Sequence, residues 1–294
     1  MMRTSTVTST DTDVAQSSSC APIDFRQSAR RCEFLRAQNM DVHYITATDD
    51  DRRPRATALL ERTDDRWFMV KGPAGDSHPD LLRSLLDQCS QLPDMTLVLL
   101  PEWDFPEVLR AAGFQPCEPF STLLVTAEGN DEEILGRMRA SARSRVRHAS
   151  RFGFRFVDDP GLLDHFYPFY AASMRETNSP DFADLEFLRG LVELPGVQLF
   201  TALHGDTVAA GSICFEHRES VEARYVATCS DYRTASPLNF LHFQTICWAR
   251  NRGKRHFDLS GLATGEVDEK LARVNRFKTG FGGAPFAYPS YTRR

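Results

Sequence analysis

The sequence lacks the patterns that are typical of membrane-spanning, disulfide-stabilised and metal-dependent proteins. Its 294 residues contain no apolar run of membrane-spanning length, so we expect no insertion into a bilayer. Seven cysteines are scattered without a CxxC pair, which argues against a disulfide framework and a zinc site. Eight histidines show neither HxxxH nor HExxH spacing, and we therefore expect no catalytic metal. This use of cysteine favours a reducing, cytoplasmic location.

The sequence also has no large excess of positive or negative charge, with 35 basic and 40 acidic residues. The net charge is -5, with 26% charged and 41% hydrophobic residues, which is the composition of a globular protein. A polyanionic partner must therefore be met by a local basic patch. Residues 1–20 are dominated by Ser, Thr and Asp and predict a disordered tail without the apolar core of a signal peptide.

The order of predicted elements repeats along the chain. Three strands, a helix, a strand, a helix and a strand are expected across residues 42–126. Nearly the same order returns across residues 197–291, although the two stretches barely match in sequence. Such a repeat predicts two α/β domains of one fold, which we place at residues 21–128 and 129–294 after the tail at 1–20.

A strongly basic helix is expected at the start of the second domain. Residues 131–150 have an acidic beginning and a basic body, and Arg139, Arg143 and Arg147 fall on one face at helical spacing. Like charges at this spacing repel each other, so the helix needs compensation. Bound phosphate groups are one source, and carboxylates of neighbouring segments around a solvated helix are the other. The sequence leaves both open.

The last predicted helix ends in Arg276-Phe277-Lys278, before a glycine pair. One interpretation is a solvated cationic helix end stabilised by the helix dipole. The other is a lysine that meets an anionic substrate or a developing oxyanion. Asp258, expected just after a short strand, is either a turn carboxylate or the group that accepts the proton of an attacking amine. Glu216 and His217 are predicted to form an exposed polar pair.

Several short stretches, in their order along the chain, resemble FemABX-type transferases, which are built from two GNAT-like acyltransferase domains. The stretches are Lys71-Gly72-Pro73, Arg143-Ser144-Arg145-Val146-Arg147-His148-Ala149, Ser236-Pro237-Leu238-Asn239, Phe257-Asp258-Leu259 and Arg276-Phe277-Lys278. The resemblance covers about residues 24–291. It implies an α/β (α+β) fold of two tandem GNAT-like domains, each a mixed, mostly antiparallel sheet flanked by helices.

The resemblance also implies an activity. FemABX-type enzymes form an amide by moving an aminoacyl group from aminoacyl-tRNA to an amine, often on a peptidoglycan precursor. Their relatives include enzymes that act on smaller, peptide-like metabolites. The expected partners are therefore the acceptor end of aminoacyl-tRNA and a small amine or peptide-like acceptor, with no bound cofactor. For this activity the candidate catalytic residues are Lys278 and Asp258, and the candidate substrate-binding residues are Arg143, Arg147, Arg233, Asn239, Arg276, Phe281 and Tyr225.

Coenzyme A is the alternative donor. GNAT enzymes that use it hold its pyrophosphate with a glycine-rich loop at a helix N-terminus, where backbone N–H groups approach the phosphates closely. The equivalent stretch, residues 229–236, has no glycine and carries Asp231, although Arg233 can still hold a phosphate. This argues against acyl-CoA. An acyl-CoA-dependent N-acyltransferase and a non-catalytic double-GNAT binding protein remain the alternative functions.

Overall fold

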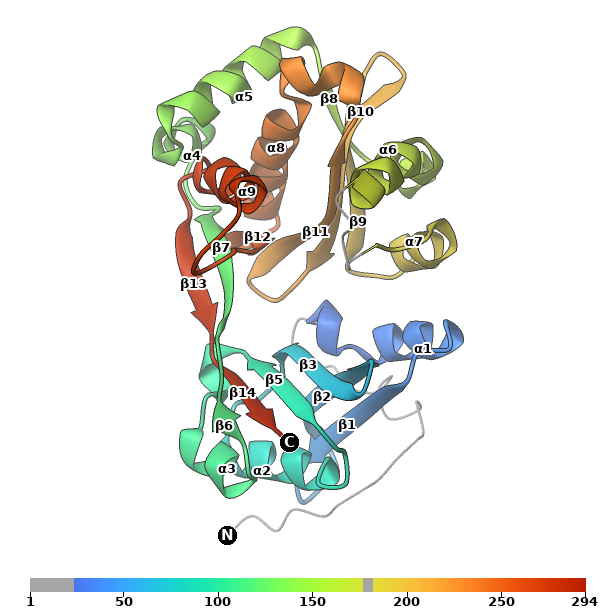
Figure 1. Cartoon of the computed structure of the whole chain (residues 1–294), viewed down its shortest axis with the longest axis vertical. Helices are drawn as coiled ribbons and strands as arrows, with labels where there is room; N and C mark the ends of the chain where they lie inside the picture. Colours follow the sequence, from blue (N-terminus) through green and yellow to red (C-terminus); the bar gives the residue numbers. More distant parts are fainter. Residues whose placement is uncertain (1–23, 177–181) are drawn as a thin grey trace. The chain divides into compact units, whose positions relative to one another are not determined.

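A computed structural model describes residues 24–176 and 182–294 (Figure 1). The predicted tail at 1–20 lies outside the described residues. Contacts divide the chain into two compact units, of which the first comprises the residues up to 120 together with Ala287–Arg294, and the second comprises Ser121–Phe286. The sequence placed the last eight residues with the second domain. They join the first unit because their strand pairs within its sheet.

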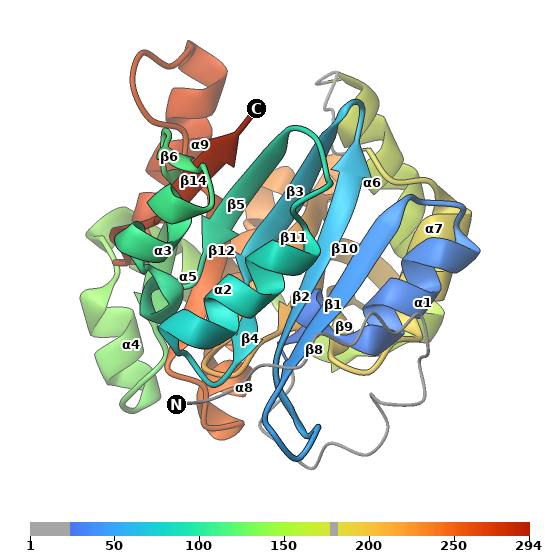
Figure 2. The same cartoon turned by 90° about the horizontal axis from the view of Figure 1, so that it is seen from below.

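The first unit is a mixed sheet with helices on it. Its described elements are η2 (Phe25–Gln27), α1 (Ala29–Ala37), β1 (Val42–Thr48), β2 (Pro54–Thr63), β3 (Arg66–Gly72), β4 (Ala74–Gly75), α2 (Pro79–Gln88), β5 (Met95–Leu99), η3 (Pro101–Trp103), α3 (Pro106–Ala111), β6 (Gln115–Pro116) and β14 (Ser290–Arg293). The strand order is β1-β2-β3-β5-β14-β6, with β4 beside β2. Strands β3 and β5 run parallel, because α2 carries the chain across the sheet between them. Figure 2 shows α2 lying across these strands.

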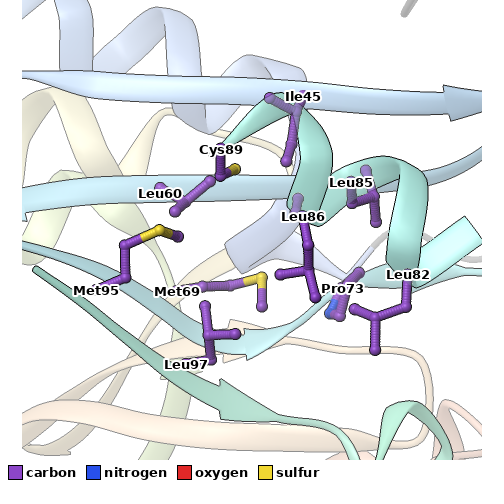
Figure 3. Close-up of a pocket in the computed structure, with 11 residues that line it drawn as sticks. Ile45, Leu60, Met69, Pro73, Leu82, Leu85, Leu86, Cys89, Met95 and Leu97 are labelled. Carbon is purple, nitrogen blue, oxygen red and sulfur yellow. The ribbon is translucent and has the colours of Figure 1, made fainter. Parts of the chain in front are cut away.

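The interior of the first unit is apolar. The helix α2 buries Leu82, Leu85 and Leu86 against the sheet, as its helical spacing of leucines predicts. A small cavity lies between this helix and the strands, and leucine, methionine and other apolar side chains line it (Figure 3). No charged group is among its lining residues, so the cavity offers nothing to orient a reacting molecule.

The second unit repeats this plan. Its elements are β7 (Phe120–Thr126), α4 (Asp131–Arg137), α5 (Ala140–Phe152), β8 (Arg155–Asp158), η4 (Pro160–Leu162), α6 (Leu163–Glu176), α7 (Leu185–Val192), β9 (Val197–His204), β10 (Thr207–Glu216), β11 (Ser220–Thr228), η5 (Ser230–Ala235), α8 (Pro237–Asn251), β12 (His256–Gly261), α9 (Glu269–Thr279) and β13 (Ala284–Tyr288). The strand order is β13-β7-β12-β11-β10-β9-β8. Here β11 and β12 are parallel and α8 is the crossover helix. The predicted fold class, two mixed sheets flanked by helices, is confirmed.

Helices cover both faces of the second sheet. On one face α8 packs on the strands and α5 lies across α8, while α6 and α7 cover the other face (Figure 1). Gly211 in β10 lets α6 approach closely, because a Cβ there would lie 2.3 Å from the Phe166 ring. The core beneath α8 includes Phe257, Ile246 and Phe281.

The basic helix is shorter than predicted. The chain breaks at Met138, whose ψ of 149° is extended, so α4 ends at Arg137 and α5 begins at Ala140. The break is held from outside, because the Arg139 N–H donates to the Gly280 carbonyl at 2.9 Å. The prediction of one helix across residues 131–150 is therefore wrong. Arg139 is the N-cap residue of α5, and Arg143 and Arg147 keep their predicted common face within it.

Gly282 is the residue that allows this contact. Its φ is +78°, and a Cβ there would lie 2.1 Å from the Arg137 carbonyl oxygen. An alanine at position 282 would have a strained left-handed backbone, and its Cβ would clash with the backbone of Arg137. No movement of a side chain relieves either effect. We expect Gly282→Ala to lower the free energy of unfolding by about 3 kcal/mol, measured by denaturant titration.

A second glycine separates the two causes. Gly265 has a nearly equal φ of +72° but nothing within 4 Å of its Cβ position. Gly265→Ala therefore carries only the backbone term, about 1 kcal/mol. Equal losses of stability in the two variants would mean that the contact between Gly282 and the break at Met138 does not constrain the second unit.

Candidate active site

Two parallel strands part in the middle of the second sheet. Strand β11 pairs with β12 over three positions, of which Glu222 opposite Asp258 is the last. Beyond this point β11 continues along β10 as far as Thr228, whereas β12 continues along β7. The edges that separate carry backbone groups directed at the space between the strands, which suits them to bind an extended ligand.

Two buried carboxylates stand where the strands part. Glu222 is 0% and Asp258 is 1% exposed, and their neighbours along each strand belong to the core under α8. By strand alternation both carboxylates therefore point to the opposite face of the sheet. Burying a carboxylate is unfavourable unless hydrogen bonds compensate the loss of water. Such bonds are present on both side chains.

Asp258 accepts the Thr122 hydroxyl and the Ser260 N–H, the latter at 2.7 Å. Glu222 lies 3.1 Å from His217 Nε2 and accepts the Ser260 hydroxyl at 3.2 Å. Ser260 thus contacts both carboxylates, one through its backbone and one through its side chain. Its φ of +55° is left-handed, and this turn of the chain places its N–H and its hydroxyl toward the pair.

Lys278 reaches this cluster from the last turn of α9. The helix begins at an N-cap, Asp268, whose side chain accepts the Leu271 N–H at 2.7 Å. The Lys278 ammonium donates to the carbonyls of Ser260 at 3.2 Å and Gly261 at 2.5 Å. Burial lowers the pKa of Lys278 to about 8, and the charges of Asp258 and Glu222 oppose that shift. The side chain is therefore mostly cationic at neutral pH, and its pKa lies only slightly above neutral pH.

A buried histidine packs behind the lysine. His242 in α8 is 2% exposed, and its ring lies 5.3 Å from Phe257, 5.8 Å from Phe277 and 5.4 Å from Phe281, between ring centroids. Burial, and then the charge of Lys278, lower the pKa of His242 to about 3. The ring is therefore neutral at every pH at which the protein would work. It supplies packing to the end of α9 and no positive charge.

The other predicted residues lie at different places. Phe281 is fully buried in the core, and Asn239 is buried at the start of α8. Arg276 is exposed on α9, two residues before Lys278, a spacing that directs the two side chains apart. Tyr225 lies in β11, three residues after Glu222, with its ring centroid 6.0 Å from that of Tyr170.

Three of the predicted arginines belong to α5 and η5. Arg143 is half-buried and donates to the carbonyls of Leu135 at 3.5 Å and Gly136 at 3.3 Å, which caps the end of α4. Arg147 is exposed, 3.4 Å from Glu132. Arg233 is exposed in η5. Of the nine predicted site residues, the structure therefore brings Lys278 and Asp258 to one cluster.

Glu222, Ser260 and His242 were not predicted from the sequence, and His217 was predicted at the surface. The predicted exposed pair of Glu216 and His217 is wrong, because His217 is 6% exposed and bonds Glu222. The sequence feature that could have indicated this site is Glu222, an acidic residue inside the strand pattern at 220–228. Its meaning depends on the register of β11 against β12, which local patterns do not contain.

Comparisons with known proteins agree with this architecture. Residues 136–278 match the model of the acetyltransferase (GNAT) domain. No curated protein sequence matches the chain. Among solved structures, FemX is similar over 95% of this chain and 94% of its own, with a TM-score of 0.77 and 14% identity. L-PGS from Bacillus licheniformis is similar over 94% of both chains, with a TM-score of 0.58 and 12% identity.

A third solved structure, the tandem GNAT protein from the clavulanic acid biosynthesis pathway, is similar over 95% of this chain and 92% of its own. Its TM-score is 0.51 and its identity 11%. The matched residues lie within the second unit, which therefore has the GNAT fold. The whole chain has the FemABX-like double-GNAT architecture that the sequence predicted. Within residues 24–176 and 182–294, no helix has both the length and the apolar character to cross a membrane.

Proposed function

We propose that the protein transfers an aminoacyl group from aminoacyl-tRNA to an amine, forming an amide. The observation that carries the proposal is the cluster of Lys278, Glu222 and Asp258 where β11 and β12 part. A cation held by two backbone carbonyls beside two buried carboxylates is a fixed charge distribution in a shielded place. Such preorganised charge is what acyl transfer needs at its transition state.

In the proposed reaction a neutral amine attacks the ester carbonyl on the tRNA 3′ end. The new C–N bond forms as the carbonyl oxygen becomes an oxyanion, which the Lys278 ammonium stabilises. The C–O bond to the ribose then breaks. The proton released by the amine passes to Asp258 and from there to the departing ribose oxygen, so charge and protons balance. No nucleophilic side chain is required, because the amine itself attacks.

Glu222 has a supporting role in this scheme. It is one strand away from Asp258, and its charge opposes the loss of the Lys278 proton. The bonds to His217 and Ser260 hold it in place. We assign it the task of keeping Lys278 cationic, which makes Glu222 a positioning residue.

The choice of donor rests on the turn before α8. Two N–H groups of this turn already donate within it, Tyr232 to the Cys229 carbonyl and Ser236 to the Arg233 carbonyl, and Pro237 has no N–H. Ser236 has a φ of +59° and its side chain makes no cap. A turn bonded in this way and bearing the exposed Asp231 is a poor cradle for pyrophosphate. This favours aminoacyl-tRNA, the donor that the FemABX resemblance implies.

The acceptor belongs to the same proposal. The FemABX resemblance points to an amine on a peptidoglycan precursor or on a smaller, peptide-like metabolite. The second candidate function is an acyl-CoA-dependent N-acyltransferase, which the acetyltransferase family match at residues 136–278 favours.

Donor discrimination tests the proposal. The full chain is incubated with a radiolabelled pool of aminoacyl-tRNAs, or with labelled acetyl-CoA, each with a panel of peptide-like amines. Label transfer from the charged tRNA pool that disappears after RNase treatment supports the proposal. Thiol release from acetyl-CoA with label transfer, and none from charged tRNA, replaces it with the second candidate.

A further inference from the structure

A group of aromatic rings lies at the surface of the second unit, where α5 ends. The ring cluster consists of Phe152, Phe154, His204 and Tyr232, from α5, the turn after it, β9 and η5. The Phe152 ring centroid is 5.0 Å from that of Phe154, 4.8 Å from that of His204 and 6.5 Å from that of Tyr232. These are stacking and edge contacts of a continuous aromatic patch.

The patch is open to a ligand. Phe152 is 41% exposed, one of the few large apolar side chains of the described residues that are, and His204 is exposed beside it. Phe154 is buried beneath them and rests on Phe240, with ring centroids 6.0 Å apart, so the patch has a firm base. Exposed aromatic surface on a fixed base is suited to stacking against a planar group.

Positive charge surrounds the ring cluster. Helix α5 contains four arginines and no carboxylate, although the chain as a whole carries a charge of -5. Arg151 precedes Phe152, Arg155 donates to the Gly205 carbonyl at 3.1 Å, and Arg233 follows Tyr232. The nearby carboxylates are Asp206, Asp231 and Glu132, and the last of these lies 3.4 Å from Arg147.

Helix α5 connects the ring cluster with the candidate active site. Its first residues contact the end of α9, where a Cβ on Gly280 would lie 3.2 Å from the Ala142 Cβ. Its last residues contact η5. At 1.5 Å per residue the 13-residue helix spans about 20 Å (Figure 1), and its four arginines are spread along that length between the end of α9 and the ring cluster.

We propose that the ring cluster and the arginines of α5 bind RNA, with an unpaired base stacked on Phe152 and phosphates on the arginines. Arginines beside exposed rings suit single-stranded nucleic acid, because the rings stack on the bases and the cations contact the phosphate backbone. The inference deepens the proposed function, on which it rests: aminoacyl-tRNA ends in unpaired nucleotides, and α5 leads from them to Lys278.

The test measures RNA binding without any reaction. Fluorescence anisotropy compares two labelled RNA hairpins, one with four unpaired 3′ nucleotides and one with a blunt end, on the full chain. Phe152→Leu keeps the apolar side chain and removes the aromatic face. We expect it to weaken binding of the hairpin with unpaired nucleotides at least about fivefold and to leave the blunt hairpin unchanged.

Two further variants make the comparison strict. Phe182, with the same 41% exposure and an arginine over its ring at 5.7 Å, lies after α6 and outside the ring cluster. Phe182→Leu is expected to bind both hairpins as the wild type does. Removing Arg147 and Arg151 together is expected to flatten the dependence of log Kd on log salt by about 0.7 for each lost phosphate contact.

The outcomes separate this inference from the proposed function. If Phe152→Leu and the wild type bind the hairpin with unpaired nucleotides equally, the ring cluster does not stack on RNA and the inference is wrong, whatever the donor is. It is also overturned if Phe152→Leu weakens only the binding of acetyl-CoA or of anionic lipid vesicles. If Phe152-dependent RNA binding is found but no aminoacyl group is transferred, the RNA surface stands and the proposed reaction falls.

Discussion

Lys278→Met is expected to lower the rate of amide formation about a hundredfold. A single preorganised donor to an oxyanion contributes roughly 2.7–4 kcal/mol to transition-state stabilisation, and methionine offers no charge in its place. The reduction should fall on kcat, because Lys278 acts on charge that develops only in the transition state. Steady-state kinetics with the donor found in the discrimination experiment measures it.

The variant should remain folded, so a lower rate can be assigned to catalysis and not to unfolding. Burial lowers the pKa of Lys278 to about 8, so at neutral pH the native protein carries a cation in an unfavourable place. Methionine removes that cost, and we expect the free energy of unfolding to stay level or rise. Lys270→Met, on the exposed first turn of the same helix, is the matched control and should retain full activity. A Lys278→Met enzyme with more than a third of the wild-type kcat would remove the lysine from the mechanism.

The pH profile of kcat is expected to fall above about pH 8. Lys278 loses its proton there, and with it the positive charge that meets the oxyanion. Lys278→Arg should carry the plateau to higher pH, because guanidinium stays protonated. Glu222→Gln should move the fall to lower pH, since the Glu222 charge opposes the loss of the lysine proton. An alkaline limb at the same pH in all three enzymes would assign it to another group.

Stability should respond to pH in the opposite direction. The folded pKa of Lys278 lies below its ordinary value of 10.5, so between about pH 8 and 10.5 the unfolded chain binds more protons at this residue. The contribution of Lys278 to the free energy of unfolding therefore rises with pH across that window. The Lys278→Met protein lacks this contribution, so the stability of the wild type relative to the variant should rise between about pH 8 and 10.

Much of the fold follows from local patterns. The leucines of α2, the N-cap Asp268 and the repeated order of strands and helices each depend on residues close together in sequence. The position of Lys278 near a helix end was also predictable, because the signals that end a helix are local. The break at Met138 was not, since its cause is the Gly280 carbonyl far along the chain.

The partner of Asp258 was hidden for a related reason. Glu222 meets Asp258 through a parallel pairing of strands with the whole of α8 between them. The register of such a pairing is decided by packing across the sheet, and a slip of one residue would turn Glu222 into the core. The ring cluster also could not be predicted from the sequence, because it joins residues from α5, β9 and η5.

The strand β14 has a consequence for how the protein is made. It lies between β5 and β6 in the first sheet, so the inside of the first unit is closed by residues synthesised after the entire second unit. Domains fold from the N-terminus as the ribosome proceeds. The sheet of the first unit therefore stays incomplete between β5 and β6 while the second unit folds. The facing edges of β5 and β6 therefore lack their partner strand until the last residues of the chain have been made.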